Sequence, residues 1–384
     1  MLENVAVFAS VMFVIAWTGI FAITSRILGN TEDLPKVDGP VRGKVSIVLP
    51  VRNEEKYVAK SLSNILGLRG VEKEVIVVDD NSDDATWQIL QHFVPLGVKA
   101  VRAGIPPEGW MGKSWACHVG YTHSTGDWLL FTDADTEFSA DVVKQAVCVA
   151  EERGLEFVSA YPRFRMNSLL HRFTMPILLV GFYIFGKPHL VKYGKSAFAF
   201  GSFILVRRDA YERLGGHYGV KDAVLEDRAL ALAAQRASLR TDLFKAFDRL
   251  VSSWNDDSKS LWNGMIRIFL PLSLKNPVKT VSVFALLTAV CLAIPILTIL
   301  TESYYAFAAA HAAAAVAAGL ESRRHSASFL HGLLWPIGVF AIMSAALTAL
   351  VKSRTTPTVV WRGREYLIEA GEHHEKAVVI SRGR

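Results

Sequence analysis

The sequence has little cysteine and no strong excess of charge of either sign. Only three cysteines occur among its 384 residues, Cys117, Cys148 and Cys291, and no two of them form a CxxC pair. Neither a disulfide framework nor a zinc site is therefore indicated, and a reducing compartment is expected. Lysine and arginine together number 42, against 36 aspartate and glutamate residues. This modest, dispersed surplus argues against a nucleic-acid-binding surface and fits the basic flanks of membrane segments.

Long apolar runs are present instead. Hydrophobic residues make up 51% of the chain and the mean hydropathy is +0.27, which allows a soluble core and additional membrane segments. Val5–Ile23 approaches the roughly 20 apolar residues that span a bilayer. A cleavable signal peptide is the alternative, but Glu3 precedes the run and no small-x-small cleavage site follows it. We therefore predict a retained transmembrane anchor at residues 1–27.

Basic residues follow this anchor and recur at the end of the chain, which predicts the orientation of both regions. Positive charge is retained on the cytoplasmic side, so the domain after the anchor is expected to be cytosolic in an integral protein of the cell membrane. A C-terminal transmembrane region is expected at 278–351, with apolar segments at 278–300, 304–320 and 329–351. The basic tail, 352–384, is expected to be cytosolic, so either the middle or the last segment would be re-entrant or interfacial. The number of crossings stays open, and interfacial helices are expected at 168–187 and 260–272.

The domain between these membrane regions, residues 43–270, has the pattern of an α/β fold. Val45–Leu49 and Glu74–Val78 are short β-branched runs typical of a buried parallel sheet. Each is followed by a helical pattern, Lys56–Leu66 and then Ala85–Phe93, with Ser82 in a position to cap the second helix. In such sheets, ligands bind at the carboxyl ends of the strands.

Carboxylates cluster at those strand ends. Asp79 and Asp80 follow one strand, and Asp133 and Asp135 follow the apolar run Leu129–Phe131. If the Asp-Ala-Asp segment is extended, both acids point the same way and Ala134 leaves room for a substrate. Hard cations such as Mg²⁺ or Mn²⁺ prefer oxygen ligands of this kind and are often shared with substrate phosphates. The alternative is a solvated turn at the end of a strand, where aspartate is common.

Several motifs in fixed order give this cluster a context. They are VSIVLPVRNEE at 45–55, EVIVVDDNSDDAT at 74–86, GKSWACHVG at 112–120, TDAD at 132–135, FGSFILVRRDAYERLGG at 200–216 and LED at 225–227. Together they resemble a family 2 glycosyltransferase with the GT-A nucleotide-sugar-binding fold, which is Rossmann-like, over about residues 44–270. PPEGWMGKSWAC at 106–117 is similar to the membrane-bound branch that glycosylates hopanoid, carotenoid and other lipids, including ceramide glucosyltransferases. The tail segment VVWRGREYLI at 359–368 also resembles that branch.

The resemblance implies roles for individual residues. It implies nucleotide contacts near the base and ribose from Pro50, Arg52, Glu54, Val78, Asp79 and Asp80. It places Lys113 near the diphosphate, Asp133 and Ala134 beside the donor, and a metal ion on Asp135 with Asp133. Gly201 and Ser202 would line the acceptor side, and Asp227, after Glu226, would be the catalytic base.

The chemistry of glycosyl transfer agrees with those roles. A nucleoside diphosphate leaves well when a cation neutralises its developing charge, and an acceptor hydroxyl attacks well when a carboxylate takes its proton. Taken alone, Glu226 and Asp227 could also be acids that stabilise a helix N-terminus. The QxxRW motif of many relatives is missing, although Arg267 could keep its charge role. We therefore expect inverting, metal-dependent, non-processive transfer from a nucleotide-sugar to a membrane lipid, with a UDP-sugar as the expected donor. A processive polysaccharide synthase and a non-catalytic nucleotide-sugar-binding membrane protein are the alternatives.

Overall fold

The computed structural model describes residues 2–37, 39–254, 257–288, 296, 299–369 and 376–379. The chain divides into two compact units. One contains Met1–Asn30, Arg165–Gly186 and Trp254–Val359, and the other contains Thr31–Phe164, Lys187–Ser253 and Val360–Arg384. Cys291, part of the predicted apolar segment 278–300 and the end of the basic tail lie outside the described residues.

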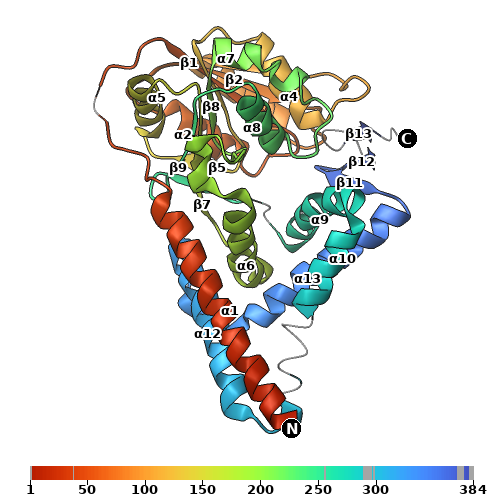
Figure 1. The fold of residues 1–384 in the computed structure, drawn as a ribbon. Helices are drawn as coiled ribbons and strands as arrows, with labels where there is room; N and C mark the ends of the chain where they lie inside the picture. Colours follow the sequence, from red (N-terminus) through yellow and green to blue (C-terminus); the bar gives the residue numbers. More distant parts are fainter. Residues whose placement is uncertain are drawn as a thin grey trace. The chain divides into compact units, whose positions relative to one another are not determined.

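The second unit is built on a seven-stranded mixed sheet with strand order β3-β2-β1-β4-β8-β6-β9 (Figure 1). The strands are β1 (Lys44–Val51), β2 (Glu72–Asp79), β3 (Val98–Arg102), β4 (Trp128–Phe131), β6 (Phe157–Tyr161), β8 (Ile204–Arg207) and β9 (Thr241–Lys245). β1 pairs in parallel with both β2 and β4, whereas β8 runs antiparallel to β4 and β6. The predicted α/β fold is therefore confirmed, including the strands expected near 45–49 and 74–78.

Both faces of this sheet are buried, which explains why its strands read as continuous apolar runs. In β1, Ile47 and Leu49 belong to one core cluster, whereas Val48 points into another. In β4, Leu130 belongs to the first cluster, and Leu129 lies in the second. Successive side chains of a strand point to opposite faces, so a sheet covered by helices on both sides needs apolar residues at every position.

Helices and short 3₁₀ segments supply those covers. The α-helices of this unit are α2 (Val58–Leu66), α3 (Thr86–Phe93), α4 (Gly112–Thr122), α5 (Val142–Arg153), α7 (Arg208–Arg213) and α8 (Glu226–Arg236). The 3₁₀ segments are η1 (Val94–Leu96), η2 (Pro188–Tyr193) and η3 (Gly216–Tyr218). The helices expected at 56–66 and 85–93 are thus present, but Ser82 does not cap α3. The N-cap position is Ala85, and Ser82 instead hydrogen-bonds to the carboxylate of Asp79 at the end of β2.

Two small sheets complete the unit. One has the order β5-β10-β7, from β5 (Thr136–Phe138), β10 (Leu250–Ser252) and β7 (Arg163–Phe164). The other has the order β11-β12-β13, from β11 (Thr358–Trp361), β12 (Arg364–Glu369) and β13 (Lys376–Val379). Val360 onward groups with the large sheet, so the C-terminal strands belong to the same compact unit as β1 and β2. The predicted tail at 352–384 is therefore not a separate segment in the part that the structure describes.

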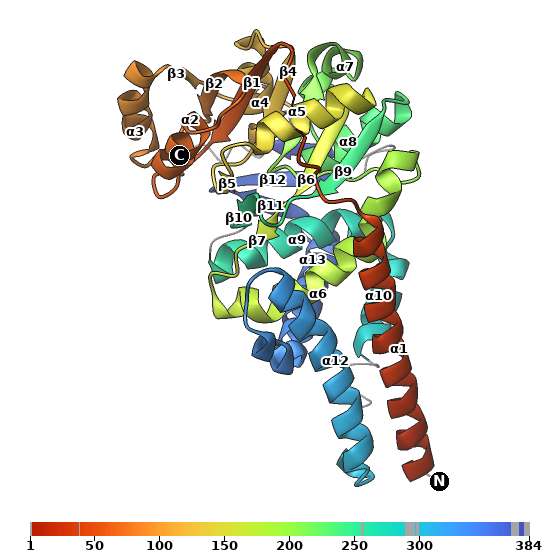
Figure 2. The same ribbon diagram turned by 90° about the vertical axis from the view of Figure 1, so that its left-hand side faces the viewer.

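The first unit is helical. It contains α1 (Leu2–Asn30), α6 (Leu169–Gly186), α9 (Ser258–Lys275), α10 (Pro277–Thr288), α12 (Tyr304–Arg324), η5 (Phe329–Leu334) and α13 (Trp335–Arg354). α1 lies beside α12 in both ribbon views (Figures 1 and 2). Trp335 packs against Phe13 and Trp17 of α1, with ring centroids 5.8 and 5.6 Å apart. These contacts give the helical unit a core of its own.

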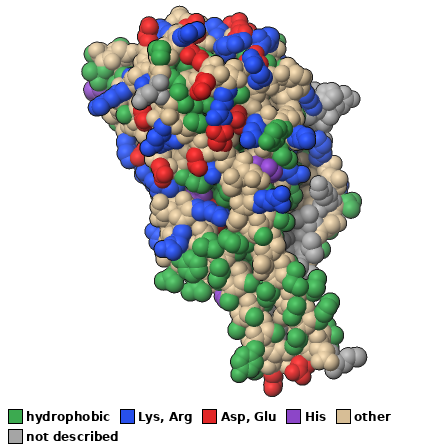
Figure 3. Space-filling model, turned by 60° about the vertical axis from the view of Figure 1, so that its left-hand side comes forward, with side chains coloured by type: hydrophobic (Ala, Val, Ile, Leu, Met, Phe, Trp, Pro, Cys, Tyr) green, Lys and Arg blue, Asp and Glu red, His purple; other side chains and the backbone are tan. Residues whose placement is uncertain are grey.

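Among the described residues, three helical segments are long and apolar enough to cross a membrane: Leu2–Asn30, Leu169–Tyr193 and Phe329–Arg354. Many large apolar side chains of α1 are exposed, among them Phe8 at 67% and Ile15 at 57%. Figure 3 shows apolar side chains gathered on one face towards the N-terminal end of α1. The predicted domain at 43–270 differs from the observed units, because residues 165–186 and 254–270 group with the helices.

The central strand β4 generates a stability prediction. Leu130 is fully buried between β1 and β8, so Leu130→Ala removes core contacts and leaves a cavity. Such a change typically costs about 2–5 kcal/mol, which should lower the unfolding midpoint of the purified protein by several degrees. Leu96→Ala is the matched control, because Leu96 is 62% exposed. Unfolding is measured by intrinsic fluorescence while the protein is heated in detergent. Equal unfolding midpoints for the two variants would contradict the assigned core.

Candidate functional site

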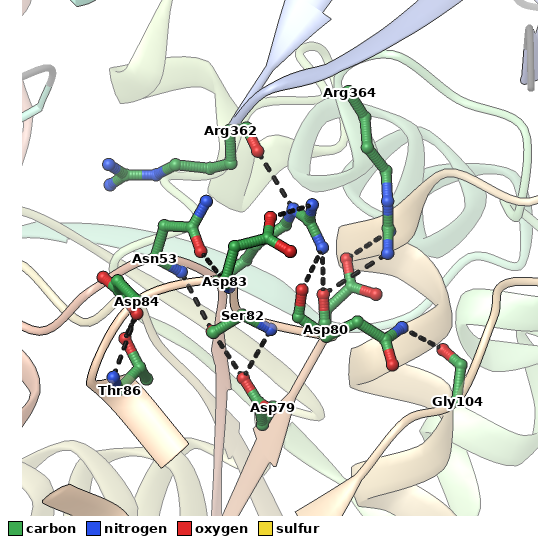
Figure 4. A network of polar contacts seen from close by, with 12 residues as sticks. Asn53, Asp79, Asp80, Ser82, Asp83, Asp84, Thr86, Gly104, Arg362 and Arg364 are labelled. Carbon is green, nitrogen blue, oxygen red and sulfur yellow. Dashed lines mark hydrogen bonds and ion pairs between the residues drawn. The ribbon is translucent and has the colours of Figure 1, made fainter. Parts of the chain in front are cut away.

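The loops after β1 and β2 form one polar network (Figure 4). The Arg52 guanidinium is buried and donates from Nη1 to the carbonyl oxygens of Asp80 and Asn81, each at 2.5 Å. Its Nη2 also lies 3.2 Å from the carboxylate of Asp83. Asn53 joins the same loops, because its Oδ1 accepts from the backbone N–H of Asp83 at 2.8 Å. Arg52 therefore fastens the two loops together, as a single cation shared among several acceptors.

The two acids at the end of β2 have different partners. Asp79 accepts from the backbone N–H of Ser82 at 3.1 Å, so its carboxylate shapes the loop. Asp80 is fully buried, and its Oδ2 accepts from Nη1 of Arg364 at 2.6 Å. Burial raises the pKa of Asp80, and the positive charge of Arg364 opposes that rise. Within the described part of the chain, Oδ1 of Asp80 has no hydrogen-bond partner.

The other residues expected near the nucleotide lie at the same sheet edge. Pro50 pairs with Val78 in the register of β1 and β2. The side chain of Val78 belongs to a core cluster with Ala116 of α4, so only its backbone is available to a ligand. Glu54 forms an ion pair with Arg362 at 2.5 Å.

A second group of charges surrounds Gly201. Lys113, in the first turn of α4, lies 2.7 Å from Asp133 and 2.6 Å from Glu226. A Cβ at Gly201 would lie 3.1 Å from Nζ of Lys113, and 3.5 Å from the nearest carboxylate oxygens of both Asp133 and Asp227. Burial opposes the charge of Lys113, but its carboxylate neighbours hold its pKa well above the ordinary value. Lys113 is thus a permanent cation that brings β4, α4 and α8 together.

Asp227 lies in the first turn of α8 and is held by backbone amides. Its Oδ2 accepts from the N–H of Gly201 at 3.1 Å, and its Oδ1 accepts from the N–H of Arg228 at 2.7 Å. Burial, followed by repulsion from Glu226, raises the pKa of Asp227 to about 6. The two amide hydrogen bonds fix the orientation of the carboxylate. The raised pKa lets it accept a proton near neutral pH.

The Asp-Ala-Asp segment is a turn, not an extended strand. β4 ends at Phe131, and the N–H of Thr136 bonds back to the carbonyl oxygen of Asp133 at 3.2 Å. The expectation that strand alternation aligns the two acids is therefore wrong, and the turn brings them together instead. Asp135 is half-buried and hydrogen-bonded by Ser252 Oγ at 3.3 Å. Burial and repulsion from Asp133 raise the pKa of Asp135 to about 6.

The structure thus brings most of the predicted site residues to one edge of the sheet. Arg267 lies on α9 in the helical unit, and its Nε is buried without a partner among the described residues. Sequence reasoning did not assign Arg362, Arg364 or Tyr366 to the site. The one sequence feature that pointed to them was the similarity of the tail segment VVWRGREYLI to a related branch of proteins. That similarity did not indicate where the segment lies in the fold.

Comparison with known proteins agrees with this architecture. A mannosyltransferase from Pyrobaculum calidifontis has a similar structure, with a TM-score of 0.55 and 20% sequence identity over 92% of this chain and 99% of that chain. At this identity the likeness concerns the fold.

The curated relatives are glycosyltransferases. The chain is 28% identical over 245 residues to a 4,4'-diaponeurosporenoate glycosyltransferase of Staphylococcus haemolyticus, covering 60% of this chain and 63% of the relative. It is 30% identical over 213 residues to the protein of the same name from Staphylococcus aureus, covering 53% and 54%. The match thus spans less than two thirds of either relative.

Residues 46–215 match the family model described as glycosyl transferase family 2. This segment runs from β1 to the end of α7 and contains Asp80, Lys113, Asp133, Asp135 and Gly201. The chain therefore contains a glycosyl transferase family 2 domain, which has the GT-A fold.

Proposed function

We propose that the protein transfers one sugar from a nucleotide-sugar, with a UDP-sugar as the expected donor, to a lipid held in the membrane, with inversion at the anomeric carbon. The observation that carries this proposal is the arrangement around Gly201, where Lys113, Asp133 and Asp227 converge on one small residue. When an acceptor displaces a diphosphate, a cation stabilises the departing group and a base takes the proton of the acceptor. Both kinds of group are present beside Gly201.

The donor would lie across the carboxyl ends of β1, β2 and β4. Asp80, at the β2 end, has a buried carboxylate oxygen without a partner among the described residues, and this oxygen suits an N–H group of the nucleobase. Lys113 would then contact the diphosphate, because it is a cation in the first turn of α4 and lies 2.7 Å from Asp133. We assign the sugar to the space beside Gly201 and Ala134, between these groups and Asp227.

A divalent cation fits Asp133 and Asp135. Both carboxylates lie in one turn, and their mutual repulsion helps to raise the pKa of Asp135, which a cation would relieve. No set of three His, Cys, Asp or Glu side chains that could hold a metal occurs among the described residues, so substrate phosphates would supply further ligands. When bound, Mg²⁺ or Mn²⁺ would neutralise charge on the departing diphosphate.

Asp227 would take the proton of the acceptor. The amides of Gly201 and Arg228 fix the carboxylate, and its raised pKa of about 6 leaves it largely ionised at neutral pH. The curated relatives' name denotes a carboxylate acceptor, which is already ionised and needs no base. The fixed, proton-accepting state of Asp227 favours an acceptor hydroxyl in this protein. Glu226 would act through Lys113, with which it forms an ion pair at 2.6 Å.

The order of the two units along the chain limits which helices can cross the membrane. Phe164 and Lys187 both belong to the sheet unit, so a single crossing by α6 (Leu169–Gly186) would divide that unit between two sides. We therefore retain α6 as an interfacial helix, although its length and composition would allow a crossing. The same reasoning favours an even number of crossings between Ser253 and Val360 and supports a C-terminal tail on the side of the sheet unit.

The two alternatives differ in their products. A processive synthase would release a polymer, whereas the proposed enzyme adds one sugar per lipid. A non-catalytic sensor would bind the nucleotide-sugar without consuming it. The raised pKa of Asp227 favours an enzyme, because ligand binding alone requires no proton acceptor.

Neutralising either acid should abolish transfer. Asp227→Asn removes the base and should lower kcat by about 10²- to 10⁴-fold, and Asp135→Asn should cause a comparable loss by weakening cation binding. The measurement is mass-resolved product formation from a nucleotide-sugar panel and a total lipid extract, using membranes that contain the full-length protein. Asp248→Asn is the matched control, because that aspartate is exposed in the same unit. Near-complete activity of Asp227→Asn would favour an acceptor that needs no base and would rule out the role assigned here.

Activity should also depend on pH with a defined sign. The pKa of Asp227 is raised from 3.8 to about 6, so its proton-accepting form is present above pH 6 and is lost as the pH falls through that value. With saturating cation, kcat/KM should fall about tenfold per pH unit below 6. With limiting cation the fall should be steeper, because protonation of Asp135 near the same pH competes with the metal. A flat profile between pH 5 and 8 would be incompatible with this assignment.

A further inference from the structure

A tight hairpin turn near the C-terminus lies within the sheet unit. The turn between β11 and β12 consists of Arg362 and Gly363, whose φ angles are 45° and 82°. Positive φ at both central residues is typical of a two-residue hairpin, and glycine adopts it without strain. From Val360 onward, the chain groups with β1 and β2, even though 310 positions separate Arg52 from Arg362 and 284 separate Asp80 from Arg364.

The tip of this hairpin is attached to the loop after β1 (Figure 4). Nε of Arg52 donates to the carbonyl oxygen of Arg362 at 2.9 Å. The side chain of Arg362 pairs with Glu54 at 2.5 Å. Both partners in the loop are residues that the family resemblance assigns to the nucleotide. The hairpin therefore ends where the donor is expected to bind.

Arg364 fixes the orientation of Asp80. Its Nη1 donates to Oδ2 of Asp80 at 2.6 Å, and its Nη2 donates to the carbonyl oxygen of the same residue at 3.3 Å. The side chain of Asp80 is only 1% exposed, so this charge-assisted bond is poorly screened by solvent. With Oδ2 engaged, the other carboxylate oxygen remains a buried acceptor without a partner in the described part of the chain.

Tyr366 and Gly112 show that the hairpin fits closely. Tyr366 is fully buried, and its hydroxyl accepts from the backbone N–H of Gly112 at 3.1 Å. A Cβ at Gly112 would lie 2.4 Å from Oδ2 of Asp80 and 2.6 Å from Nη1 of Arg364. The start of α4 therefore accepts only glycine while the hairpin is in place. Ile368, further along β12, is also fully buried, as expected for a permanent contact and not for a loosely held lid.

We propose that the C-terminal hairpin forms one wall of the nucleotide site, in which Arg364 and Tyr366 position Asp80 to accept an N–H from a uracil or guanine base. This inference rests on the proposed function and names the part of the chain that completes the donor site. Arg364 and Tyr366 are positioning residues, since they act through Asp80 and Gly112.

The chemistry of Asp80 restricts the base. Uracil and guanine carry a ring N–H at the edge used in base pairing, which a carboxylate oxygen accepts. Cytosine and adenine have an unprotonated ring nitrogen at that place, and its lone pair would face the carboxylate. Loss of that hydrogen bond leaves the buried oxygen unpaired, which is costly. UDP and GDP should therefore bind more tightly than CDP and ADP.

Nucleotide binding by the full-length protein in detergent, measured by titration calorimetry with UDP and Mn²⁺, tests the proposal without an acceptor. Arg364→Gln should raise the Kd for UDP by about tenfold or more, as expected for loss of a charge-assisted interaction. Arg364→Lys should give an intermediate Kd, because it restores the charge without the planar fork. Tyr366→Phe and Gly112→Ala should weaken UDP binding as well. Arg354→Gln is the matched control, because Arg354 is exposed at the end of α13 and should leave the Kd unchanged.

Two further readouts separate positioning from a general structural effect. Binding of inorganic pyrophosphate with Mn²⁺ should be the same in wild type and Arg364→Gln, because Arg364 acts at the base. With saturating donor, kcat should change less than twofold while the donor KM rises. An unchanged Kd for UDP in Arg364→Gln and Tyr366→Phe, or higher activity after their substitution, would overturn the proposal, and the second result would indicate an inhibitory plug.

The proposed function fails differently. Wild-type protein that binds UDP with the expected base preference but transfers no sugar would contradict the enzyme assignment and leave the hairpin inference intact. Wild-type protein that transfers sugar while Arg364→Gln binds UDP normally would contradict the hairpin inference alone.

Discussion

Repulsion among carboxylates gathered at one edge of a sheet is the constraint on which this structure depends. Most of these acids are matched by a cation. Glu54 pairs with Arg362, Asp80 with Arg364, and both Asp133 and Glu226 with Lys113. Each pair joins different elements of the fold, so charge compensation also holds the loops in place. Unmatched, these buried or half-buried acids would favour their neutral forms.

Asp135 and Asp227 differ from these ion-paired acids. Among the described residues, Asp135 and Asp227 have no ion pair within 4 Å, and their partners are a serine hydroxyl and backbone amides. The pKa of each is raised to about 6. These two acids therefore keep capacity for a cation or a proton, whereas Asp133, the other proposed metal ligand, is already paired with Lys113.

Much of the catalytic edge could be predicted from local sequence. The apolar runs of β1 and β2 identify a buried parallel sheet, and the rule that ligands meet strand ends places Asp80 and Asp135 near one another. Predictions from local sequence were wrong where a side chain is bonded to a residue from another part of the fold or lies in a turn. Ser82 bonds to Asp79 instead of capping α3, and the acids at 133 and 135 meet through a turn and not through strand alternation. Propensity cannot resolve such choices, because each depends on a neighbour that only the fold provides.

The hairpin lay beyond local reasoning for a different reason. Arg364 pairs with Asp80, although 284 positions of sequence separate them. The local sequence around either residue does not indicate that the other is its partner. Between the two lie the segments of the helical unit at 165–186 and 254–359. The nucleotide end of the sheet is therefore finished by residues made after the apolar helices. Until those helices have been synthesised, Arg364 is not available to pair with Asp80. Completion of the polar network at the end of β2 is thus coupled by chain order to synthesis of the helical unit.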